Sequence, residues 1–153
     1  MPDYKQIKTQ LHAHCLARAA QSIQTARAAL EAAQEAGNSE TRSSAGDKYE
    51  TGRAMMQAEQ ERHKAQLLKA IELKNRLAQI RPDHSSETAG PGSLVITNHG
   101  KFYLSAGLGK VKLEGAVYFA VSPESPLGHA LKGRKKGEQF IFQGRNYAVG
   151  EIA

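Results

Sequence analysis

The feature that most constrains this sequence is its opening stretch, because residues 3–36 contain neither glycine nor proline. Alanine, the strongest helix former, recurs throughout it. Apolar and small residues recur at intervals of three and four, namely Ile7, Leu11, Cys15, Ala19, Ile23, Ala26, Leu30 and Ala33. The stretch therefore predicts one long helix. Its apolar stripe is built largely of small side chains, so a partner helix can approach closely.

A second long helix is predicted beyond a loop. Gly37–Asn38 is a typical helix stop, and residues 37–46 are rich in Ser, Thr and Gly. The next helix should begin at Asp47 or Lys48 and end at Ile80, before Pro82. Its expected seam comprises Met56, His63, Leu67, Ala70, Ile71 and Leu77, with Tyr49 near its start.

Two such helices joined by a short loop predict an antiparallel hairpin, a coiled coil over residues 1–81 with its tip at about residues 37–50. Each helix would be about 50 Å long at roughly 1.5 Å per residue. The middle of the second helix is almost wholly polar, which favours a hairpin that projects into solvent as a monomer. Half of a four-helix bundle, completed by a second copy of the chain, remains the alternative.

Residues 82–92 have the composition of a linker, and short strands are expected beyond it, in residues 93–153. The predicted strands are Ser93–Thr97, Lys101–Ser105, Val111–Leu113, Val117–Val121, Gln139–Phe142 and Asn146–Ile152, with one helix at 126–132. The predicted fold class is therefore α+β. A long helical hairpin precedes a small domain of antiparallel strands with one short helix.

The short helix carries clear boundary signals. Ser125 suits the N-cap and Pro126 the first helical position, while Leu127, Ala130 and Leu131 form its apolar face: this is a complete helix start. A glycine at position 133 ends the helix, and four basic residues lie near its C-terminal carbonyls, Lys132, Arg134, Lys135 and Lys136. This cluster could contact nucleic acid or an acidic protein, or simply be solvated.

Composition narrows the class of protein. The net charge is +6, and residues 92–153 hold 8 Lys and Arg against 4 Asp and Glu, which favours acidic partners such as nucleic acid or an acidic protein surface. No apolar run approaches the ~20 residues that span a bilayer. A single cysteine, Cys15, excludes an internal disulfide. These features, with no apolar leader near the first residue, predict a cytoplasmic protein without a membrane partner.

Residues 122–138 read Ser-Pro-Glu-Ser-Pro-Leu-Gly-His-Ala-Leu-Lys-Gly-Arg-Lys-Lys-Gly-Glu. This stretch resembles the C-terminal signature of the bacterial Gre transcript-cleavage factors (GreA/GreB), and the likeness continues to Glu151–Ile152. The resemblance implies an FKBP-like C-terminal domain and a transcription elongation factor that binds RNA polymerase. Its coiled coil would enter the secondary channel, near nascent RNA, and the segment Ser125, Pro126 and Leu127 would dock at the channel entrance.

The resemblance extends more weakly to the hairpin tip. The Gre tip motif is Gly-Asp-Leu-Ser-Glu-Asn, and here residues 46–51 read Gly-Asp-Lys-Tyr-Glu-Thr. The implied acidic pair is Asp47 and Glu50, three apart at a helix start and so on one face. This pair would share a Mg²⁺ ion with the polymerase and stimulate cleavage of backtracked RNA by two-metal chemistry. The protein would then be no enzyme itself and hold no tightly bound cofactor.

Several alternatives stay open. Asp47 and Glu50 also suit any helix N-terminus. Another register places Arg42 and Ala45 at the acidic positions, and Lys48 would weaken a bound cation, so a channel-binding regulator without cleavage activity is a second hypothesis. A peptidyl-prolyl isomerase or a dimeric helical module are the others. His12, His14 and Cys15 hint at a metal site, but His14 points away from the other two on a helix.

Overall fold

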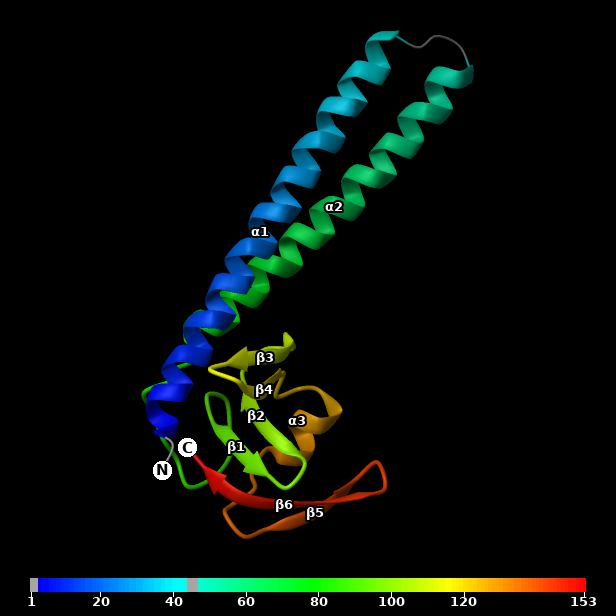
Figure 1. Ribbon diagram of the computed structural model, residues 1–153. Helices are drawn as coiled ribbons and strands as arrows, with labels where there is room; N and C mark the ends of the chain where they lie inside the picture. The colour runs from blue at the N-terminus through cyan, green and yellow to red at the C-terminus, as the bar shows by residue number, and fades with distance from the viewer. Residues whose placement is uncertain (1–2, 44–46) are drawn as a thin grey trace. The chain divides into compact units, whose positions relative to one another are not determined.

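The structure is a computed structural model that describes residues 3–43 and 47–153, and the side chains of residues 38–50 lie outside that description. It is an α+β protein with two long helices, then a six-stranded mixed sheet with one short helix (Figure 1). The chain divides into two compact units. One comprises Met1–Ala17 with Asn75–Ala153, and the other is Arg18–Lys74. Among the described helices, none has the length and apolarity needed to cross a membrane.

Helix α1 runs from Tyr4 to Ser43 and helix α2 from Asp47 to Gln79. The start and end of α2 confirm the prediction to within a residue. The predicted helix stop at Gly37–Asn38 is wrong, because α1 continues through both residues. A Cβ atom at Gly37 would lie 2.8 Å from Nε2 of Gln60 and 3.7 Å from Cβ of Met56. This glycine therefore serves close helix packing, and the predicted loop is helical as far as Ser43.

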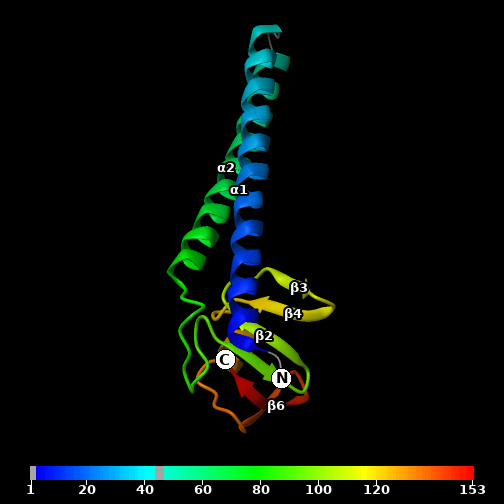
Figure 2. The same ribbon diagram turned by 60° about the vertical axis from the view of Figure 1, so that its left-hand side comes forward.

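Within residues 18–74 the small side chains of α1 face α2. Ala19, Ala26 and Ala33 are buried, as the apolar stripe predicts. Gln60 donates a hydrogen bond from Nε2 to the backbone oxygen of Ala33 at 3.5 Å. The two helices lie beside each other over this unit in both views (Figures 1 and 2).

The sheet order is β3-β4-β2-β1-β6-β5. The strand bounds are β1 Leu94–Thr97, β2 Gly100–Leu104, β3 Gly109–Leu113, β4 Ala116–Val121, β5 Gln139–Phe142 and β6 Arg145–Ile152, and α3 spans Pro126–Leu131. All six predicted strands are present. The expectation of antiparallel strands alone is wrong, since β4 pairs with β2 in parallel. The chain leaves β2, forms the outermost strand β3, and returns as β4 between the two, which makes β4 parallel to β2.

The sheet carries two layers of side chains, because successive strand residues point to opposite faces. The face that packs on α3 holds the main core: Ala89, Val95, Phe102, Leu104, Leu131, Phe140, Tyr147 and Val149 are buried together. The opposite face includes Tyr103, which contacts His12 near the start of α1. Residues 4–17 of α1 therefore belong to the sheet-containing unit, which sequence periodicity did not indicate.

The predicted linker, residues 82–92, is irregular, as its composition predicts, and is bound to the sheet unit. Ala89 donates to the backbone oxygen of Arg134 and accepts from the N–H of Gly133, both at 2.8 Å. Thr88 forms an isolated bridge with Lys135, and Ala89 is 3% exposed. The last residues of the predicted linker are therefore part of the folded domain.

Candidate functional site

The segment from Ser122 to Gly133 is built around an N-capped helix. Ser125 has extended backbone angles, accepts a hydrogen bond from the N–H of Gly128 at 3.0 Å, and donates to the backbone oxygen of Ser122 at 2.7 Å. Pro126 occupies the first turn, where its missing N–H is not needed. The N-cap prediction is confirmed. Because the helix packs tightly against the backbone of residues 122–123, its position relative to that loop is fixed.

The three predicted docking residues differ in their surroundings. Ser125 is half-buried, and its hydroxyl is fully engaged as the cap. Leu127 is half-buried against the core, and Pro126 is exposed. If this segment binds a partner, Pro126 is the residue of the three that can offer most of its surface, while Ser125 and Leu127 hold it in place.

Replacing Ser125 by alanine removes the cap and is expected to cost about 1 kcal/mol of unfolding free energy. The N–H of Gly128 and the carbonyl of Ser122 would both lose a partner. Urea denaturation measures the change. Ser22→Ala, at an exposed helical position of α1, is the matched control and should change stability by less than about 0.5 kcal/mol. Equal stability of Ser125→Ala and the parent would contradict the capping role.

Two of the four basic residues after α3 have partners within the domain. Arg134 donates from Nε to the backbone oxygen of Ala130 at 2.9 Å, pairs with Glu138 at 3.7 Å, and covers the Phe140 ring at 4.6 Å. Lys136 pairs with Glu151 at 3.3 Å. This cluster is thus a weaker candidate for nucleic-acid binding than its sequence indicates.

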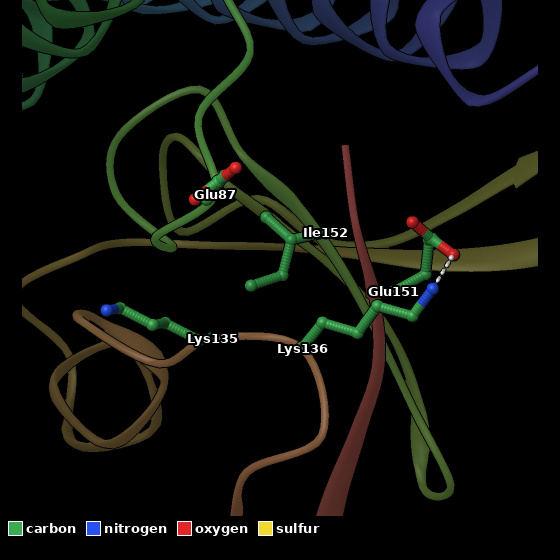
Figure 3. A pocket seen from close by; sticks show the side chains of 5 residues that line it. All are labelled: Glu87, Lys135, Lys136, Glu151 and Ile152. Carbon is green, nitrogen blue, oxygen red and sulfur yellow. Dashed lines mark ion pairs between the residues drawn. The ribbon is translucent and has the colours of Figure 1, made fainter.

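A hollow of about 350 Å³ lies beside this cluster (Figure 3). It is lined by Glu87, Lys135, Lys136, Glu151 and Ile152. Figure 3 shows the Lys136–Glu151 ion pair on one side, with Lys135 reaching away from it. Its two ammonium groups and two carboxylates balance in formal charge, so the lining gives no reason to expect an anion rather than a cation.

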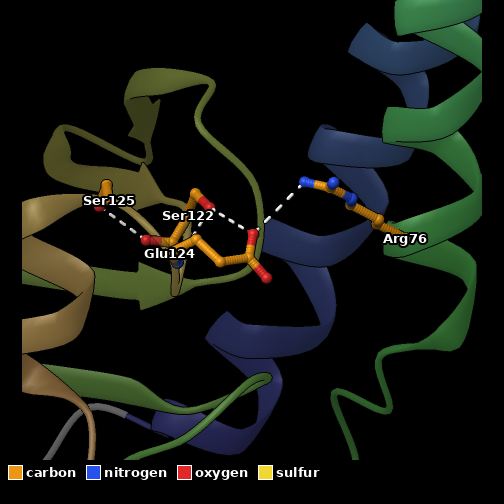
Figure 4. A network of polar contacts seen from close by, with 4 residues as sticks. All are labelled: Arg76, Ser122, Glu124 and Ser125. Atoms are coloured by element: carbon orange, nitrogen blue, oxygen red, sulfur yellow. Dashed lines mark hydrogen bonds and ion pairs between the residues drawn. The ribbon is translucent and has the colours of Figure 1, made fainter.

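A second polar arrangement connects α2 to the loop before α3 (Figure 4). Nη1 of Arg76 lies 3.4 Å from Oε2 of Glu124. The hydroxyl of Ser122 donates to the same carboxylate at 3.3 Å and accepts from the N–H of Glu124 at 3.2 Å. Both charged side chains are more than half exposed, so the pair adds little stability. The pair joins the end of α2 to Glu124, the one acidic side chain of the loop.

Three titratable side chains are buried where α1 meets the sheet unit. Lys8 is 1% exposed and donates from Nζ to the backbone oxygen of His84 at 2.8 Å. Nδ1 of His12 lies 2.9 Å from the hydroxyl oxygen of Tyr103. Burial lowers the pKa of Lys8 and of His12, although Asp83 opposes the first shift and a hydrogen bond with the Leu77 backbone the second. Burial also raises the pKa of Tyr103. All three groups are held in their buried arrangement by specific partners.

This arrangement predicts acid sensitivity. Because the folded protein lowers the pKa of His12, the unfolded chain binds the proton more readily. The free energy of unfolding should therefore fall as the pH drops below about 6.5, the ordinary histidine value. His12→Gln keeps a hydrogen-bonding side chain and removes the titration. Chemical denaturation from pH 8 to 5 should show a shallower decline for this variant than for the parent. Identical slopes would contradict the assignment.

The sequence predicts one metal site, at Asp47 and Glu50, and argues against a weaker candidate at His12, His14 and Cys15. Over the part of the chain that the structure describes, no group of three His, Cys, Asp or Glu residues could hold a metal ion, and this includes His12, His14 and Cys15. Asp47 and Glu50 are the first and fourth residues of α2, but their side chains lie outside the described residues. The acidic pair therefore stays a prediction supported by helical spacing alone.

Comparisons with protein-family models, with curated proteins and with solved structures found no match.

Proposed function

We propose that this protein is a transcription elongation factor of the Gre type, which binds RNA polymerase through its secondary channel and stimulates cleavage of backtracked RNA. The observation that carries the proposal is the segment 122–138, whose sequence resembles the Gre signature. Within it, Pro126–Leu131 form a short helix with Ser125 as N-cap. The two long helices that precede it supply the elongated element that such a factor needs.

The proposal includes the finer features that the resemblance implies. The C-terminal domain would be FKBP-like, and residues 18–74 would pair as a coiled coil. Support for the pairing comes from the buried small residues of α1 and from Gln60, which donates a hydrogen bond to the backbone oxygen of Ala33. Pro126, exposed at the start of α3, would contact the polymerase at the channel entrance.

Asp47 and Glu50 would supply carboxylates to a Mg²⁺ ion shared with the polymerase. Residues three apart at a helix start lie on one face, and carboxylate oxygens are the ligands that Mg²⁺ prefers. The ion would provide an activated water for attack on the RNA phosphodiester. The polymerase would remain the enzyme.

A second candidate, a channel-binding regulator without cleavage activity, is favoured by one specific observation. Lys48 stands between the two carboxylates where the Gre motif has leucine. An ammonium group there competes with a divalent cation for the same carboxylates.

The test is transcript cleavage in a stalled, backtracked complex of the cognate RNA polymerase with Mg²⁺, with and without this protein. Shortening of the RNA that depends on the protein supports a cleavage factor. Binding to polymerase without shortening supports the regulator. Absence of both binding and shortening overturns the proposal altogether.

A further inference from the structure

Two hollows in the sheet-containing unit adjoin at the end of α2, and together they are called the end-of-helix groove. Their volumes are about 340 and 260 Å³, and both are lined by Gln79, Ile80 and Pro91. Arg81 and His84 line the first hollow alone. The second hollow is completed by Arg76, Ser105, Pro123 and Glu124. This end-of-helix groove is separate from the charged hollow of Figure 3, with which it shares no lining residue.

The groove combines an apolar floor with a basic rim. Ile80, Pro91 and Pro123 provide aliphatic surface. Arg76 and Arg81 are exposed cations on the rim. Glu124 is the one carboxylate among the lining residues, and it is already paired with Arg76 (Figure 4). The rim therefore carries more positive than negative charge, because its two arginines face a single glutamate.

We propose that this groove binds an extended acidic peptide segment of a partner protein. An apolar side chain would lie on Ile80 and Pro91, and flanking carboxylates would meet the guanidinium groups of Arg81 and Arg76. Arginine suits carboxylates because its planar donors can form two parallel hydrogen bonds. Apolar anchors surrounded by a charged rim are typical of peptide-binding surfaces.

The walls favour a peptide over single-stranded nucleic acid. Grooves for unpaired bases use aromatic rings as stacking platforms, whereas the non-histidine lining residues here are aliphatic, polar or charged. This inference does not depend on cleavage activity, and its experiment needs no polymerase.

The experiment measures binding of a fluorescein-labelled peptide, Glu-Glu-Leu-Glu-Glu with blocked ends, by anisotropy at low ionic strength. Arg81→Glu should weaken binding about five- to tenfold. Glu124→Gln should tighten it about twofold, because Arg76 loses its internal competitor. Lys132→Glu, the same charge reversal at an exposed position outside the groove, should change binding less than twofold.

Amide NMR shifts give the second readout. Addition of the peptide should perturb Ile80 and Ser105, while a peptide with serine in place of leucine should bind several-fold more weakly. If Arg81→Glu and Lys132→Glu lowered the peptide affinity equally, the loss would reflect the overall charge of the protein and not the groove. That result would overturn the proposal. So would absence of binding at millimolar peptide, or tighter binding at the same amides of a single-stranded oligonucleotide of equal charge.

Discussion

The double substitution Asp47→Ala/Glu50→Ala is expected to lower protein-stimulated transcript cleavage by about 100-fold while leaving affinity for polymerase unchanged. The reason is that both carboxylates would act only as ligands of the shared Mg²⁺, so their loss removes the activated water and no docking contact. The measurement is the rate of RNA shortening in a backtracked complex, with polymerase binding followed separately by a competition assay.

Two further variants make this result specific. Glu72→Ala removes an exposed carboxylate from the same helix and should leave the cleavage rate within about twofold of the parent. Lys48→Leu removes the cation between the two carboxylates and should raise the rate. An active double variant would contradict the role of the acidic pair. It would not support the alternative register either, because Arg42 and Ala45 offer no carboxylate to a metal ion.

The C-terminal unit could be predicted closely because its signals are local. Turns at Asn98–His99 and Glu114–Gly115 separate strands whose alternation is visible in the sequence, and Ser125 marks a helix start. The helix stop predicted at Gly37 was wrong because glycine occurs in helices for two different reasons. It ends many of them, but it also permits close packing, and only the position of Gln60 on the facing helix distinguishes the two.

The sites depended on contacts between distant parts of the chain. Glu124 is easily noticed in the sequence because it lies between two prolines. Its partner Arg76, however, is 48 residues away along the chain. His12 and Tyr103 are separated by 91 residues, so their buried hydrogen bond had no local signal. The parallel pairing of β2 with β4 also follows from topology, since it needs β3 to lie outside both. Sequence patterns identified the helices and strands, but they could not predict which distant residues and strands would contact one another.

Gly128→Val is expected to be the most destabilising single change, with a loss of about 3 kcal/mol or more of unfolding free energy. A Cβ atom at this position would overlap the backbone oxygen of Ser122 and lie 2.9 Å from the Cα and carbonyl carbon of Pro123. These are backbone atoms, which cannot rotate away as the end of a side chain could. The helix would have to move off residues 122–123, which would disturb the Ser125 cap and the packing of Leu131 in the core.

Gly107→Val is the matched control, since nothing lies within 4 Å of a Cβ atom built there. It should change the unfolding free energy by less than about 0.5 kcal/mol. Thermal unfolding should therefore separate the two variants by roughly 6–12 °C for a chain of this size. Similar melting temperatures would show that α3 can shift away from residues 122–123 at little cost. The presentation of Pro126 would then be adjustable, and a rigid docking segment at the polymerase would lose its structural basis.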